Sequence, residues 1–176
     1  MFTAQDLRVL AEAEIDDLLE DADIIPNINS ALIEFADDYR LTATQEMNAE
    51  AGKWYDRADG HLAVVHVTCE DGRDYRGSFE ISHDGSKIRF ECSGKYTVTS
   101  IVAPEPIAAM DEPIPVHDVF KVGLSRYLQA CFKLKDNDQN EDGIRLKAEA
   151  MALVRRASSL LAQGDIRQGQ RVVIKR

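Results

Sequence analysis

The chain has 176 residues, a formal net charge of −10 and 44% hydrophobic residues, which suits one globular domain with a real core. The acidic balance argues against a protein that coats nucleic acid or docks on an anionic membrane, since both need clustered lysine and arginine. No apolar run approaches the roughly 20 residues that span a bilayer.

Two helices are predicted at the N-terminus. Thr3 and Asp6 form a capping-box pattern with Asp in place of Glu, which predicts a helix from about Ala4 to Glu20. After a break at residues 21–23, Pro26 opens a second helix, and the two make a helical hairpin. The first helix and its exit are crowded with acids: Glu12, Glu14, Asp16, Asp17, Glu20, Asp21 and Asp23.

Residues 41–60 show no clear period, and a third short helix over Ala43–Tyr55 is one interpretation. On that basis residues 1–60 belong to the helical part of the domain. The single tryptophan, Trp54, falls in this stretch. We expect it to lie in the core or to anchor a contact between subunits, rather than to stack on a ligand.

The period then changes to that of β-structure. Segments 62–69, 75–82, 87–92 and 96–102 are rich in β-branched and aromatic residues and are predicted strands. Asp-Gly pairs at 71–72 and 84–85 mark turns between them. Such short turns favour an antiparallel meander of about four strands, inserted over residues 61–103.

Residues 112–163 are predicted to form two long antiparallel helices. Apolar residues recur at three- and four-residue steps from Val116 to Phe132, with Pro115 at the helix start. A second periodic run extends from Glu141 to Gln163 and is stopped by Gly164. The predicted fold is therefore α+β and mainly helical, with one domain over residues 1–163 and a flexible tail over residues 164–176.

The tail is basic and contains a β-prone triplet, Val172-Val173-Ile174, between Arg171 and Lys175. This composition is typical of a tail that adds a strand to another chain. A disordered terminus is the alternative interpretation.

The sequence contains no motif that identifies an enzyme. The nucleophile elbow, the phosphate-binding loop, the dinucleotide loop and the paired histidines of zinc proteases are all absent. The acidic loop 136–143 places its glycine at the wrong position for a calcium-binding EF-hand. His66 and Cys69 are three apart on a predicted strand and would point to opposite faces. We therefore expect no catalytic residues, no metal and no cofactor.

Cysteine usage bears on the compartment. The three cysteines, Cys69, Cys92 and Cys131, are dispersed and odd in number. This pattern favours a reducing compartment over a disulfide framework. The first residues also lack the basic and apolar segments of a secretory signal.

One pattern links the predicted sheet to the last two helices. Tyr96-Thr97-Val98-Thr99 is followed by Pro104 and Pro106, and then by Asp111-Glu112-Pro113-Ile114-Pro115. With the helix that contains Tyr127-Leu128 and Cys131-Phe132, and the closing helix Arg145–Leu161, this order resembles the head-to-tail adaptor (connector) proteins of tailed bacteriophages. The likeness is one of element order, covers most of the chain, and leaves residues 41–60 unmatched.

The resemblance implies a structural virion protein of the neck, made in the host cytoplasm and without catalysis. Copies would form a ring of about twelve subunits beneath the portal protein and present a surface to the next neck or tail protein. The ring would extend the DNA channel, and acidic walls would let DNA pass without specific binding. The portal-binding tail would comprise Gln170, Arg171, Val172, Val173, Ile174, Lys175 and Arg176.

An alternative of another class is an acidic inhibitor that mimics DNA and binds a nucleic-acid enzyme. The net charge and the acid-rich first helix favour it. It predicts regularly spaced surface carboxylates and gives the basic tail no role. An enzyme of unknown type ranks last, because no constellation of residues supports it.

Overall fold

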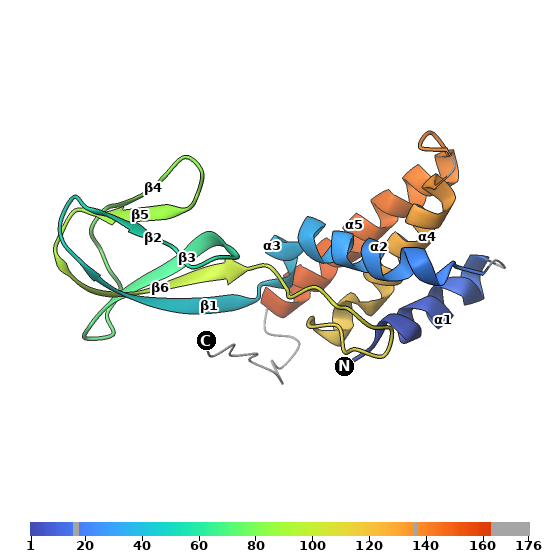
Figure 1. Ribbon diagram of the computed structural model, residues 1–176, viewed down its shortest axis with the longest axis horizontal. Coiled ribbons are helices and arrows are strands. Elements are labelled where there is room, and N and C mark those ends of the chain that lie inside the picture. The colour runs from blue at the N-terminus through green and yellow to red at the C-terminus, as the bar shows by residue number, and fades with distance from the viewer. Residues whose placement is uncertain (16–17, 136, 163–176) are drawn as a thin grey trace. The chain divides into compact units, whose positions relative to one another are not determined.

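The computed structural model describes residues 1–15, 18–135 and 137–162 (Figure 1). Over these ranges the chain is α+β, with five α-helices and two three-stranded antiparallel sheets, which confirms the predicted class. The residues divide into a helical unit (1–39 and 104–162) and a β unit (40–103). In the described ranges, no helix has both the length and the apolar character needed to cross a membrane.

The helical unit is built around α4 (Lys121–Leu134), which packs against α1 (Ala4–Ile15), α2 (Asp21–Glu34) and α5 (Glu141–Ala162). The short helices α3 (Ala36–Tyr39) and η1 (Asp118–Phe120) complete it. The apolar faces expected from the helical period are buried. Core side chains include Leu7, Ile24, Ile28, Leu32, Phe120, Leu124, Leu128 and Val154.

The N-terminal helices differ in their limits from the prediction. The capping box forms, because Thr3 N donates to Asp6 at 2.9 Å and Asp6 N donates to Thr3 Oγ1 at 3.2 Å. Pro26 lies inside α2, however, and does not open it. The helix begins at Asp21, where carboxylates in the first turn complement the helix dipole.

Helix α4 begins six residues later than the predicted start at Pro115. Residues that precede prolines favour extended backbone, and Ile114 stands between two prolines. Ile114 N donates to Phe2 O at 2.9 Å, and Thr3 and Pro113 form an antiparallel bridge. His117 then caps η1, since its Nδ1 accepts from Val119 N at 3.2 Å.

Helices α4 and α5 approach closely at Gly123, so we expect Gly123→Val to destabilise the helical unit. A Cβ at residue 123 would lie 2.8 Å from Val154 Cγ2 and 3.3 Å from Val154 N. Overpacking there should lower the free energy of unfolding by about 2 kcal/mol, measured by urea unfolding at 222 nm. Adding Val154→Ala should cost less than the sum of the two single changes; strict additivity would contradict the contact.

The β unit is formed by β1 (Thr42–Ala49), β2 (Trp54–Asp56), β3 (His61–Cys69), β4 (Phe79–Ile81), β5 (Lys87–Phe90) and β6 (Gly94–Val102). The strand orders are β1-β6-β3 and β2-β5-β4. One hydrophobic cluster joins the two sheets, with Phe90 stacked on Tyr96 at 4.2 Å between ring centroids. The other buried members of this cluster are Met47, Ala49, Val67, Ile88 and Val98.

The β unit corrects several sequence predictions. The third helix over Ala43–Tyr55 is wrong: Met47 and Ala49 are buried while Glu46 and Asn48 are exposed, which is the two-residue period of a strand. Strands therefore begin at residue 42, within the stretch assigned to the helical part. The described strands number six instead of about four, and they do not form a meander, because β6 lies between β1 and β3. The predicted strand 75–82 shortens to Phe79–Ile81.

Candidate functional site

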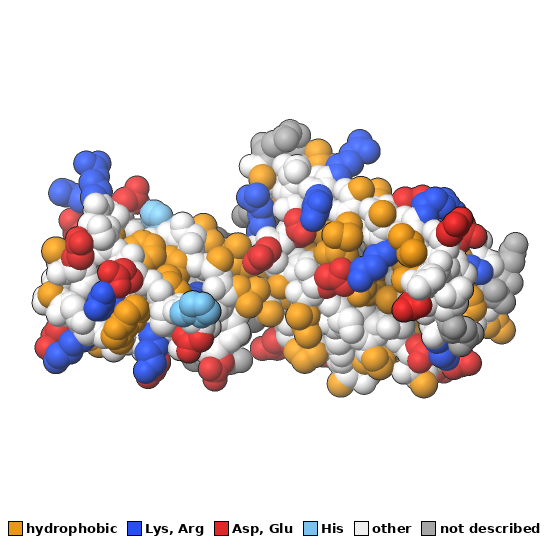
Figure 2. Space-filling view, turned by 90° about the horizontal axis from the view of Figure 1, so that it is seen from above, with side chains coloured by type: hydrophobic (Ala, Val, Ile, Leu, Met, Phe, Trp, Pro, Cys, Tyr) orange, Lys and Arg blue, Asp and Glu red, His pale blue; other side chains and the backbone are white. Residues whose placement is uncertain are grey.

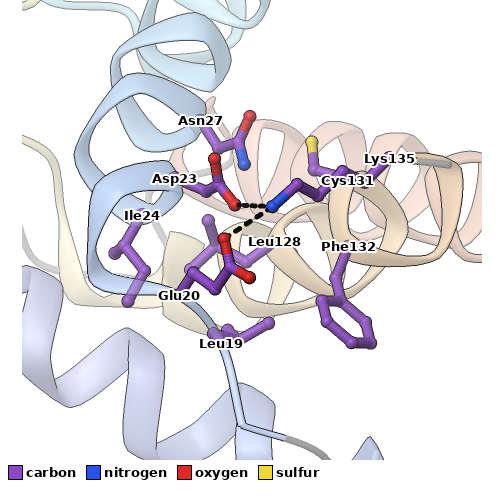
Figure 3. Close-up of a pocket in the computed structure, with 9 residues that line it drawn as sticks. All are labelled: Leu19, Glu20, Asp23, Ile24, Asn27, Leu128, Cys131, Phe132 and Lys135. Atoms are coloured by element: carbon purple, nitrogen blue, oxygen red, sulfur yellow. Dashed lines mark hydrogen bonds and ion pairs between the residues drawn. The ribbon is translucent and has the colours of Figure 1, made fainter.

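The helical unit contains a pocket of about 150 Å³ between α2 and α4 (Figure 3). Its lining mixes apolar side chains with polar and charged ones, and a cavity of this size accommodates a benzene-sized group. The pocket lies between the end of α4 and the segment that leads into α2. The residues that line it are Leu19, Glu20, Asp23, Ile24, Asn27, Leu128, Cys131, Phe132 and Lys135.

A lysine bridge forms the polar rim of the pocket. Lys135 Nζ lies 2.7 Å from Glu20 Oε2 and 2.8 Å from Asp23 Oδ2, as the dashed lines in Figure 3 mark. Hydrogen bonds to Asp23 and Glu20 raise the pKa of Lys135, which therefore stays cationic at neutral pH. Because the three side chains are solvated, the bridge contributes little to stability. The bridge places positive and negative charges at the rim of the pocket, beside the apolar side chains that line it.

Cys131 lies in the pocket wall, and its thiol is expected to be unreactive. Burial raises the pKa of its thiol to about 11, so the thiol is neutral at pH 7. A neutral thiol beside Leu128 and Phe132 behaves as a small apolar group. The pocket thus has the chemistry of a recess that binds an apolar side chain next to a polar or charged one.

The described acids of residues 12–23 are paired within the helical unit. Arg8 bonds both Glu12 and Asp21, and Arg126 Nη1 lies 2.7 Å from Glu14 Oε2. Gln129, which is fully buried, donates from Nε2 to the same Glu14 carboxylate at 2.8 Å. These carboxylates therefore connect α1 to its neighbours instead of forming a row of free surface charge.

Trp54 is not in the core, and that part of its prediction is wrong. Its side chain is 42% exposed, and the Arg89 guanidinium lies 4.9 Å from the ring centroid. Arg89 also pairs with Glu80, so a row of three side chains crosses the β2-β5-β4 sheet. Tyr55, next in the strand, packs against the core cluster instead. A role for Trp54 as an anchor between subunits stays a prediction.

His66 and Cys69 lie apart, as the strand geometry predicts. His66 pairs with Asp74 at 3.2 Å, whereas Cys69 packs against the interior cluster. Among the residues that the structure describes, no three His, Cys, Asp or Glu side chains gather to hold a metal. On the face drawn in Figure 2, acidic and basic side chains are intermixed, with hydrophobic ones between them. The predicted portal-binding tail, residues 170–176, lies outside the described residues.

No known protein family matches the chain, and neither does any curated protein. Sequence reasoning missed the pocket because its two walls come from residues 19–27 and 128–135, which are distant in the chain. No local pattern in the sequence points to the pairing of Lys135 with Glu20 and Asp23.

Proposed function

We propose that the chain is a structural virion protein, a head-to-tail adaptor of a tailed bacteriophage. Copies form a ring under the portal, extend the DNA channel and join the capsid to the neck or tail. The observation that carries the proposal is the chain path from β6 into α4. A strand that contains Tyr96 leads through a proline-rich segment, which is held by the N-terminal residues, to the long α4–α5 pair.

This path suits an assembly protein. The β unit is inserted between α3 and α4, so the helices can pack without it and the sheets can face a separate partner. The helical unit offers a recess with an apolar floor, which suits a side chain from a neighbouring protein. The net charge of −10 suits a channel wall that does not bind the phosphates of DNA.

The acidic-inhibitor alternative is weaker because the described acids of residues 12–23 already have basic partners. A DNA mimic has to present carboxylates that a basic partner can pair with. Here Glu20 and Asp23 share Lys135, while Glu12 and Asp21 share Arg8. A basic surface would have to displace these cations first.

Native mass spectrometry of the chain mixed with the portal protein of the same genome tests the proposal. We expect a complex that carries about a ring of copies, and we expect deletion of residues 165–176 to abolish it. Val173→Asp should weaken docking at least about tenfold, since it places a charge within the apolar triplet of the tail. Gln168→Asp, which adds the same charge outside the triplet, is the matched control and should dock normally.

Two outcomes would contradict the proposal, the first its adaptor function and the second the role of its tail. One is a monomer that ignores the portal protein under all conditions. The other is portal binding that survives the deletion, which would remove the role of the tail.

A further inference from the structure

Helix α2 presents an uncharged face to solvent. Residues 24–33 contain no Asp, Glu, Lys or Arg, although 30% of the chain is charged. Four exposed residues of α2 follow helical spacing and lie on its outer side: Ala22, Pro26, Ser30 and Ile33. Ile33 is 72% exposed, which is high for a large apolar side chain.

Helix α5 presents a second uncharged face. Ile144, Ala148 and Ala152 recur at four-residue steps and are exposed, with Ile144 at 52%. The opposite side of α5 is buried through Leu146, Ala150 and Val154. Both helices pack against α4, and each turns its uncharged face away from it. One subunit therefore carries two unlike docking faces.

Each face ends in charges that have no partner among the described residues. Asp37 and Asp38 lie in α3, just after α2, and neither forms an ion pair with a described side chain. Arg155 and Arg156 follow Ala152 on α5, are exposed, and likewise form no ion pair with a described side chain. At the other end of α2, by contrast, Asp21, Asp23 and Glu20 are paired with Arg8 or Lys135.

We propose that the α2 face of one copy packs against the α5 face of the next copy in the ring. The helices run parallel, so that Asp37 and Asp38 reach Arg155 and Arg156 of the neighbour. On α5 one helical turn separates Ala152 from Arg155, and Asp37 follows Ile33 by four residues, just beyond the C-cap of α2 at Phe35. The inference rests on the proposed ring assembly and identifies the two surfaces by which neighbouring copies would meet.

Two physical requirements favour this pairing. A ring needs a heterologous interface, in which two different surfaces of the same subunit meet. Copies that each carry a charge of −10 also repel one another, so they associate best where charges are absent or complementary. The α2 and α5 faces meet both requirements.

Charge reversal of the full chain tests the interface. The acid variant carries Asp37→Arg and Asp38→Arg, and the arginine variant carries Arg155→Glu and Arg156→Glu. Each alone should associate at least about tenfold more weakly than the unchanged chain, because like charges would meet at every contact. A 1:1 mixture of the two should restore rings, since alternating copies again pair opposite charges. Native mass spectrometry and sedimentation, with and without the portal protein, give the copy number.

The control variant, Asp111→Arg with Asp138→Arg, changes the net charge as much as the acid variant but lies on neither face. It should assemble normally. If each variant alone assembles like the unchanged chain, or if the mixture fails to restore rings, the interface is wrong. The adaptor function would still stand if the unchanged chain forms a ring on the portal. It would fall only if the unchanged chain neither assembles nor binds.

Discussion

Arg57→Ala is expected to lower the free energy of unfolding of the β unit by about 3 kcal/mol or more. Arg57 is only 7% exposed, and its guanidinium donates to Gly85 O at 2.6 Å and to Leu62 O at 3.1 Å. It also reaches Ser100 Oγ at 3.4 Å. Alanine would leave these buried and part-buried acceptors without their donor and would open a cavity.

The geometry explains why a buried arginine stabilises this unit. Its acceptors belong to the β4–β5 turn, to β3 and to β6, so one side chain ties together both sheets. Backbone carbonyls solvate the cation in place of water. Burial lowers the pKa of Arg57, but an arginine stays protonated throughout the accessible pH range.

Trp54 makes the measurement specific, because the only tryptophan of the chain lies in the β unit. Urea unfolding followed by its fluorescence should show the loss for Arg57→Ala. Arg76→Ala is the matched control: Arg76 is exposed in the same unit, and its removal should change the free energy of unfolding by less than about 0.5 kcal/mol. Equal midpoints for the two variants would show that Arg57 does not join the sheets.

Local patterns predicted much of the fold. The three-four spacing of apolar residues located α5 within one residue of its ends, and the capping box located the start of α1. Segments 87–92 and 96–102 were predicted as strands; the first contains β5 and the second lies within β6. These features depend on neighbours within a few residues, and such neighbours are visible in the sequence.

The errors arose where distant residues decide the structure. Pro115 would suit a helix start, but Phe2 pairs with Ile114 and holds the segment extended. Strand β1 has little hydrophobic content, and it becomes a strand by pairing with β6, about fifty residues later. The position of Trp54 follows from the alternation of β2, in which Tyr55 faces the core. The pocket depends on the packing of α2 against α4, and no local pattern predicts it.

The helical unit should respond most strongly to Phe120→Ala. Phe120 is fully buried at the start of α4, and its ring meets Tyr39 edge-on with 4.9 Å between centroids. Tyr39 is buried as well, and its hydroxyl donates to Ala31 O at 3.2 Å. Removing the Phe120 ring should cost about 3–5 kcal/mol, because a cavity would form and the aromatic pair would be lost.

The change should be detected as a lower urea midpoint in the helix signal at 222 nm. Val122→Ala is the control: Val122 lies two residues away, is 54% exposed and should change the free energy of unfolding by less than about 0.5 kcal/mol. Because the two units have separate cores, Phe120→Ala should shift the helix signal more than the Trp54 fluorescence. An equal shift of both probes would mean that the units unfold as one, and a loss no larger than that of Val122→Ala would show that Phe120 is not central to the helical core.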